Sequence, residues 1–153
     1  MLERVLFVCT GNTCRSPMAE AVLKHLKRDI EVKSAGIFAG NGQGANPNAI
    51  QVLKKRGIDF TTHESQPVTD ELMEWADVIL TMTAHHKLTL EMEYPESVQK
   101  IFTLKEYTLT EEDTDLNPDI LDPIGLSEET YEQTLNEIEK YIKRLIDQEE
   151  DDT

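Results

Sequence analysis

The chain has 153 residues, a length typical of one domain, and 39% of them are hydrophobic. Lysine and arginine number 15 and aspartate and glutamate 30, which gives a formal net charge of −15 at pH 7. Nucleic acid and anionic membrane surfaces are bound through lysine and arginine, so this charge argues against both kinds of partner.

Short apolar runs alternate with amphipathic stretches along the first part of the chain. Residues 4–9 predict a strand buried on both faces, followed by a polar loop. A helix is expected to follow, with Ser16 as its N-cap and Pro17 at its first position. Residues 31–35 predict a second strand, and the glycine-rich stretch 36–46 predicts a loop.

The alternation continues to the end of the chain. Helices are expected from Asn46-Pro47 to a C-cap at Gly57, over 70–76 with Thr69 as the N-cap, from Thr83 toward Tyr94 and from Ser127 onward. Strands are expected over 78–82 and 100–104. The acidic stretch 111–126 predicts an extended loop, and residues 149–153 predict a solvated acidic tail.

Strands that alternate with helices imply βαβ units and a parallel sheet. We therefore predict a single α/β domain over residues 1–153, with a central four-stranded parallel sheet and helices on both faces. Ligands of such sheets bind at the carboxyl ends of the strands. This directs attention to the loop after the first strand.

Residues 9–16 read Cys-Thr-Gly-Asn-Thr-Cys-Arg-Ser, and the pattern indicates an anion-binding loop. Backbone N–H groups of a tight loop and a helix N-terminus both favour an anion, and Gly11 allows unusual backbone angles. Arg15 adds a planar fork that matches two phosphate oxygens. The same positive field favours the thiolate of Cys9, which could attack phosphorus in line and form a phosphocysteine.

This loop resembles the phosphate-binding loop of the low-molecular-weight protein tyrosine phosphatases, and it fits without a gap. The resemblance covers essentially the whole chain. The segment Ser34-Ala35-Gly36, the strand at 77–82 and the pair Asp122-Pro123 fall in the order that the family shows.

Within the family, the chain looks most like the bacterial protein arginine phosphatases. Thr13 stands where the tyrosine-specific branch usually has an aliphatic residue, and residues 102–107 also look like the arginine branch. Ile124 replaces the aromatic residue that usually lines the substrate pocket, which weakens the tyrosine interpretation more than the arginine one. Phe38 is a candidate for the opposite wall.

The resemblance implies a role for each matching residue. Cys9 is the nucleophile, Asp122 is the general acid and then the base, and Ser16 donates a hydrogen bond to the Cys9 thiolate. Asn12 braces the loop together with Ser34 and His63, and Thr13 positions substrate or water. The phosphoryl oxygens are held by Arg15 and by the backbone of Thr10, Gly11, Asn12, Thr13 and Cys14.

Two further points stay open at this stage. Asp115 and Asp119 lie close to Asp122 in the sequence and are rivals for its role. Cys14 could form a reversible disulfide with Cys9 under oxidation, or it could be a small buried loop residue.

The sequence thus predicts a phosphatase that needs no metal or cofactor and acts on phosphoarginine in proteins. The nearest alternative is the same chemistry on phosphotyrosine, and a non-enzymatic alternative is a phosphate-binding or redox-sensing module. Since no apolar run approaches the roughly 20 residues of a membrane span and no secretion signal is visible, we expect a cytoplasmic protein. A monomer is expected.

Overall fold

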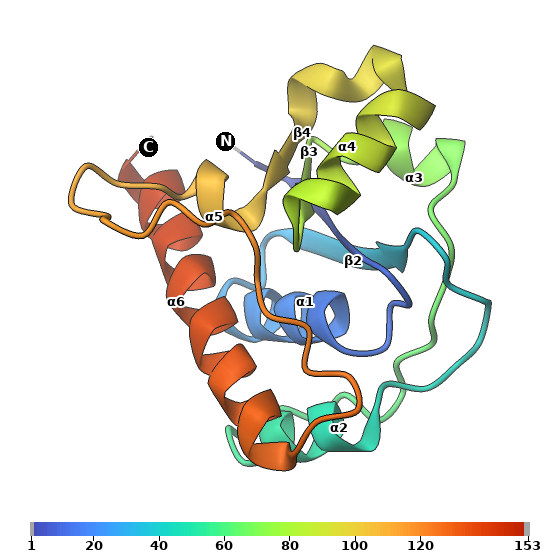
Figure 1. Ribbon diagram of the computed structural model, residues 1–153, viewed down its shortest axis with the longest axis vertical. Helices are drawn as coiled ribbons and strands as arrows, with labels where there is room; N and C mark the ends of the chain where they lie inside the picture. Colours follow the sequence, from blue (N-terminus) through green and yellow to red (C-terminus); the bar gives the residue numbers. More distant parts are fainter. Residues whose placement is uncertain (1, 152–153) are drawn as a thin grey trace.

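The computed structural model describes residues 2–151, and helices and strands alternate within them (Figure 1). The strands are β1 (Arg4–Cys9), β2 (Glu31–Gly36), β3 (Val78–Thr81) and β4 (Ile101–Thr103). The helices are α1 (Arg15–Leu26), α2 (Pro47–Lys54), α3 (Asp70–Trp75), α4 (Ala84–Glu93), α5 (Leu104–Tyr107) and α6 (Glu128–Asp151), and a 3-10 helix, η1 (Pro95–Lys100), precedes β4. The sequence patterns did not predict α5 or η1.

The four strands form one parallel sheet in the order β2-β1-β3-β4. The chain passes from β1 to β2 on one side and then returns to β3 on the other side of β1. The switch point therefore lies at the carboxyl ends of β1 and β3, where ligands of such sheets bind. Cys9, the last residue of β1, pairs in register with Gly36, the last residue of β2.

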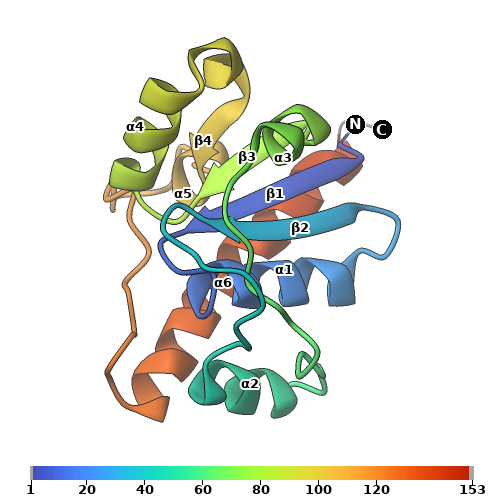
Figure 2. The same ribbon diagram turned by 90° about the vertical axis from the view of Figure 1, so that its right-hand side faces the viewer.

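Side chains of β1 alternate between the two faces of the sheet. Val5 and Phe7 pack in a cluster with α1, α2 and α6, whereas Leu6 and Val8 pack in a second cluster with α3 and α4. Figure 2 shows α1 and α6 on one side of the sheet and α3 and α4 on the other. The predicted fold, a four-stranded parallel sheet with helices on both faces, is confirmed.

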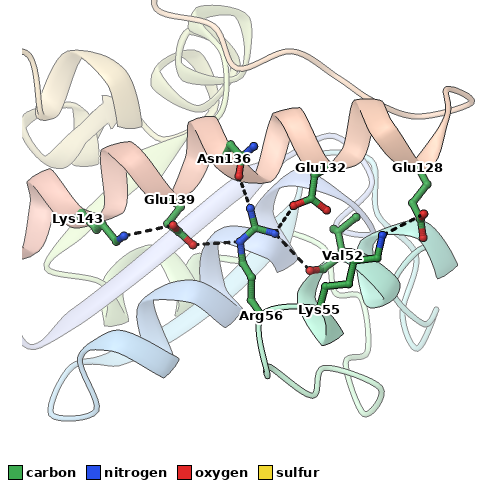
Figure 3. Close-up of polar contacts among 8 residues, drawn as sticks. All are labelled: Val52, Lys55, Arg56, Glu128, Glu132, Asn136, Glu139 and Lys143. Carbon is green, nitrogen blue, oxygen red and sulfur yellow. Dashed lines mark hydrogen bonds and ion pairs between the residues drawn. The ribbon is translucent and has the colours of Figure 1, made fainter.

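Arg56, just beyond α2, fixes that helix against α6 (Figure 3). Its guanidinium donates to the carboxylates of Glu132 and Glu139 at 2.7 and 3.2 Å and also contacts Asn136. The Arg56 side chain is partly buried, and charge-assisted bonds in such a setting are stronger than exposed ion pairs. The contacts hold the first half of α6, which includes Tyr131, beneath the loop that follows β1.

The acidic end of the chain differs from the prediction. Helix α6 continues through Asp151, and Glu149 is only 8% exposed because its carboxylate accepts a hydrogen bond from the backbone N–H of Leu2 at 2.6 Å. The prediction of a solvated tail is therefore wrong for Glu149. The start of β1 and the end of α6 lie on the same side of the fold (Figure 1), so the Leu2 backbone N–H reaches Glu149 although the two residues are far apart in the sequence. Residues 152–153 of the predicted tail lie outside the described residues.

No helix within residues 2–151 is long and apolar enough to cross a membrane.

Candidate active site

The phosphate loop, residues 9–16, runs from the last residue of β1 into the start of α1, and several of its backbone carbonyls turn outward. Those of Cys9, Thr10 and Thr13 accept hydrogen bonds from backbone N–H groups of the glycine-rich loop, at 3.0, 2.9 and 2.8 Å respectively. In a planar trans peptide, a carbonyl and the next residue's N–H point in opposite directions. The following N–H groups therefore turn toward the inside of the loop, which is the arrangement that binds an anion.

Asn12, and not Gly11, has the unusual backbone conformation in this loop. Its φ of 58° lies in the left-handed region, which asparagine tolerates better than most residues. Gly11 has no positive φ, and a Cβ at Gly11 would come no closer to other atoms than 3.9 Å, at Thr13 Oγ1. The prediction that Gly11 supplies the backbone freedom is wrong, because the turn falls one residue later.

Gly36 is required by the close approach of the phosphate loop to β2. A Cβ at Gly36 would lie 2.6 Å from the Thr10 carbonyl oxygen and 2.9 Å from the Asn12 backbone nitrogen. Real Cβ atoms do not approach backbone atoms this closely, so any larger residue would push the loop away. The same backbone contact lets the loop lie directly over the carboxyl ends of β1 and β2.

The Asn12 side chain is fully buried and joins several elements. The Gln66 backbone N–H donates to its Oδ1 at 3.0 Å, which fixes the orientation of the amide. Its Nδ2 then donates to the hydroxyls of Ser16 and Ser34, both at 2.9 Å, and the His63 ring contacts the Asn12 carbonyl at 2.8 Å. The contacts with Ser34 and His63 match those that the family resemblance implies, and Gln66 adds a partner that sequence reasoning missed.

Ser16 lies 2.9 Å from the Cys9 sulfur. Because the Ser16 oxygen already accepts from Asn12, its one proton remains to be donated, and the Cys9 sulfur at 2.9 Å is a nearer acceptor than the Ala35 carbonyl at 3.5 Å. A bond donated to Cys9 favours its thiolate. This use of the hydroxyl corrects the helix prediction: α1 begins at Arg15, and Ser16 is not its cap. Cys14 occupies the N-cap position and makes no side-chain cap bond, which suits an anion at the helix N-terminus.

Arg15 and Asp122 meet beside the phosphate loop. Arg15 is 4% exposed, and its guanidinium donates to the carbonyl of Ile120 at 3.0 Å and lies 3.5 Å from the Asp122 carboxylate. The Asp122 side chain stays accessible to solvent, and its other oxygen accepts from the Ile124 backbone N–H at 3.1 Å. The segment that carries Asp122 is thus fastened to the buried arginine of the phosphate loop.

The two rival carboxylates have structural partners instead. Asp119 accepts a hydrogen bond from the Ala84 backbone N–H at the start of α4, at 2.8 Å. Asp115 lies 3.7 Å from the ammonium group of Lys105 and is largely exposed. Of these three acidic residues, Asp122 is the one paired with Arg15.

Cys14 and Phe38 differ in their exposure to solvent, since Cys14 is buried and Phe38 is exposed. Cys14 is buried, with its sulfur 3.3 Å from the Tyr131 hydroxyl, and both cysteines are free thiols. Burial raises the pKa of the Cys14 thiol, and the hydrogen bond from Tyr131 opposes this only in part, so Cys14 is protonated at neutral pH. Phe38 is 80% exposed, and its backbone N–H donates to the Thr10 carbonyl, which places the backbone of Phe38 beside the phosphate loop.

His86 is a second residue that sequence reasoning missed at this site. The sequence showed only two adjacent histidines on a helix, a pattern that indicates nothing about the phosphate loop. In the structure, His86 is buried, and its Nε2 lies 2.8 Å from the Thr10 hydroxyl. Among residues 2–151, no group of three or more His, Cys, Asp or Glu side chains is placed to hold a metal ion.

Comparison with known protein families identifies the family of this chain. The model of the family described as low molecular weight phosphotyrosine protein phosphatase matches residues 4–152. The chain belongs to this family. Among its relatives, a protein-arginine-phosphatase of Bacillus subtilis (strain 168) is 43% identical over 148 residues, which cover 94% of this chain and 95% of the relative.

Solved structures of the low molecular weight phosphatase family agree with this assignment. The YwlE arginine phosphatase from Geobacillus stearothermophilus is 42% identical and superposes with a TM-score of 0.89 over 98% of this chain and 94% of that one. A low molecular weight protein tyrosine phosphatase from T. tengcongensis is 43% identical, with a TM-score of 0.88 over 95% and 99% of the two chains. A further YwlE structure, at 42% identity and a TM-score of 0.88 over 95% and 94%, is a cysteine-to-serine mutant with a phosphorylated active-site serine.

Proposed function

We propose that this phosphatase hydrolyses phosphoarginine in proteins through a phosphocysteine on Cys9, without a metal ion. The main observation behind the proposal is that Cys9, Arg15 and Asp122 lie together at one anion-binding loop. It is supported by the names of the relatives at 43% identity, two of which are protein-arginine-phosphatases. The phosphorylated serine in a mutant of one relative supports covalent catalysis at the equivalent side chain.

In the first step, the Cys9 sulfur attacks phosphorus while the loop N–H groups and Arg15 hold the phosphoryl oxygens. An S–P bond forms, the P–N bond breaks, and its electron pair goes to the guanidine nitrogen. The Asp122 carboxyl group delivers a proton to that nitrogen, so that a guanidinium leaves. Preorganised N–H donors stabilise the charge that builds up on the oxygens in the transition state.

In the second step, water attacks the phosphocysteine. The Asp122 carboxylate accepts the proton of the water, an O–P bond forms, the S–P bond breaks, and inorganic phosphate leaves. The Cys9 thiolate returns to its hydrogen bond with Ser16. Asp122 ends the cycle protonated, as the first step requires, so the two steps balance without another reactant.

The proposed preference for phosphoarginine over phosphotyrosine depends on the polar groups that would contact the substrate beside the phosphate loop. The carbonyl oxygen of the Asp122 carboxyl group can accept a hydrogen bond from a guanidinium N–H, and the Thr13 hydroxyl offers a polar contact where an aliphatic side chain would favour an aryl ring. Ile124 is exposed and provides no aromatic face. Phosphotyrosine is the second candidate, because the tyrosine phosphatase from T. tengcongensis is as similar to this chain as the arginine phosphatases are.

The test is phosphate release from matched phosphoarginine and phosphotyrosine peptides in the presence of EDTA, with Cys9→Ser as the inactive control. We expect preference for phosphoarginine, and Thr13→Val should lower the ratio of the two kcat/KM values about tenfold by removing one polar contact. Preference of the native enzyme for phosphotyrosine would overturn the substrate assignment. Release from neither peptide by a folded protein would favour a binding module.

We further propose that the enzyme works in the cytoplasm as a monomer. Two free thiols beside the reaction centre suit a reducing compartment. Cys9, Arg15, Asp122 and the Asn12 network all belong to one chain. Size-exclusion chromatography with light scattering would test the oligomeric state, because a monomer should have a mass near the 17.4 kDa of the chain.

A further inference from the structure

The N-terminal end of α4 touches both functional loops. Its first N–H group, that of Ala84, is bound by Asp119 of the segment that carries Asp122, at 2.8 Å. Two residues further along the chain, the His86 ring reaches the Thr10 hydroxyl of the phosphate loop, also at 2.8 Å. The same helix end is therefore in contact with the side of the site that holds phosphate and the side that supplies the proton.

His86 is held rigidly at this position. It is 5% exposed, and its backbone N–H donates to the Thr83 hydroxyl at 3.1 Å in the cap of α4. Its Nδ1 is buried and has no hydrogen-bond partner among the described residues. A buried N–H without an acceptor is rarer in proteins than an acceptor without a donor, so the ring proton belongs on Nε2. His86 then donates to the Thr10 oxygen.

The charges around His86 favour the neutral ring. Burial lowers the pKa of His86 to about 4, and the Arg15 guanidinium and the adjacent His85 act in the same direction. The carboxylates of Asp122 and Asp119 oppose this shift, but they do not reverse it. At neutral pH, His86 is therefore an uncharged donor, and protonation would add a charge beside Arg15 and a second N–H with no acceptor.

We propose that His86 is a positioning residue of this phosphatase: its Nε2–H holds the Thr10 hydroxyl, so that one helix end keeps the phosphate loop and the segment carrying Asp122 in register. The proposal rests on the proposed function, because it assigns His86 a part in the reaction at Cys9. Thr10 directly follows Cys9, so a fixed Thr10 side chain limits movement of the nucleophile relative to Asp122. Small displacements of reacting groups reduce rates strongly.

Two substitutions at position 86 separate this role from simple packing. His86→Gln places an uncharged N–H close to the position of Nε2, whereas His86→Met fills the space without a donor. We expect His86→Met to lower kcat about tenfold with little change in KM, and His86→Gln to restore most of the rate. The exposed neighbour His85 provides the matched control, since His85→Gln leaves both loops unchanged.

A double-mutant cycle tests the contact itself. Thr10→Val removes the acceptor while keeping the shape of the side chain, and it should lower kcat as much as His86→Met does. The double variant should then be no slower than either single variant, because both remove one shared interaction. Independent, multiplying losses would overturn the proposal, as would equal losses in His86→Met and His86→Gln.

Rates should be measured both on a phosphoarginine peptide and on a simple aryl phosphate, so that a wrong substrate assignment does not hide the result. NMR of the imidazole nitrogens provides a readout that does not depend on activity. The proposal predicts a neutral His86 ring at pH 7 with its proton on Nε2, and a changed signal in Thr10→Val. A ring protonated on Nδ1, or charged at pH 7, would contradict it even if the enzyme were fully active.

Discussion

The phosphate loop and the acid segment, residues 109–126 with Asp122, are held in different ways. In the phosphate loop, Asn12, Arg15 and Ser16 are almost completely buried and their polar groups have partners in neighbouring elements. The acid segment is largely exposed, and its two buried residues are Ile120 and Pro123. The backbone of Ile120 binds Met82 on one side and Arg15 on the other.

This difference matches the chemistry of the two parts. Stabilising a transferring phosphoryl group requires donors that are fixed before the substrate arrives. A proton donor must reach the leaving group and then admit water, so its carboxyl group must stay open to solvent, as that of Asp122 does. The buried loop therefore carries the charge stabilisation, and the exposed segment carries the proton transfer.

The largest effect is expected from Cys9→Ser in the phosphate loop. A serine hydroxyl is a far weaker nucleophile than a thiolate, so kcat should fall by about a thousandfold or more. Thermal unfolding should change little, because the side chains are similar in size. Steady-state rates and a melting curve on the same sample would check both, and appreciable turnover by Cys9→Ser would rule out Cys9 as the nucleophile.

Asp122→Asn tests the acid segment. Removing a general acid costs about a hundredfold to ten-thousandfold, and we expect kcat on phosphoarginine to fall within that range. Asp115→Asn is the matched control, because Asp115 lies in the same segment and is largely exposed, and it pairs with Lys105 and not with Arg15. If Asp115→Asn were as slow as Asp122→Asn, the assignment of the acid would be wrong.

Gly36→Ala tests whether the phosphate loop is as rigid as its contacts indicate. The added methyl group would meet the backbone of Thr10 and Asn12, so we expect a loss in kcat on the order of tenfold or more. Gly44→Ala is the control, since a Cβ at Gly44 meets nothing within 4 Å. Equal rates for the two variants would show that the loop adapts.

The smallest effect concerns the base of the acid segment, where Arg144 binds Asp113 through two hydrogen bonds of 2.7 and 2.9 Å. These bonds hold the pKa of Asp113 well below its ordinary value. The pair therefore stabilises the fold above the ordinary pKa of about 4 and loses this contribution as the pH falls further. Asp113→Asn should be less stable than the native chain in urea at pH 7, and the difference should shrink toward pH 2; a difference independent of pH would contradict this.

Features that depend on neighbouring residues in the chain could be predicted from the sequence. The side chains of Asn46, Thr69 and Thr83 cap α2, α3 and α4 as predicted, because an N-cap bond joins residues two or three apart. The parallel sheet follows from the alternation of strands and helices, and the phosphate loop was visible as a continuous motif.

Features that depend on distant residues could not be predicted in this way. Ser16 resembles a helix cap until Asn12 and Cys9 are seen to use its hydroxyl. Glu149 resembles a solvated residue until Leu2 is found beside it. His86 contacts Thr10 across 76 positions, and no local pattern in the sequence encodes that contact.

The central claim is that Cys9 forms a covalent phosphoryl intermediate that Asp122 helps to resolve. The most direct test is to mix Asp122→Asn with a phosphoarginine peptide and follow the protein by intact-mass and peptide mass spectrometry. The account predicts one added phosphoryl group, located on Cys9, that decays more slowly than phosphate release by the native enzyme. Phosphate release by the native enzyme with no adduct on Cys9 in either protein would show that water attacks the substrate directly and would contradict the account.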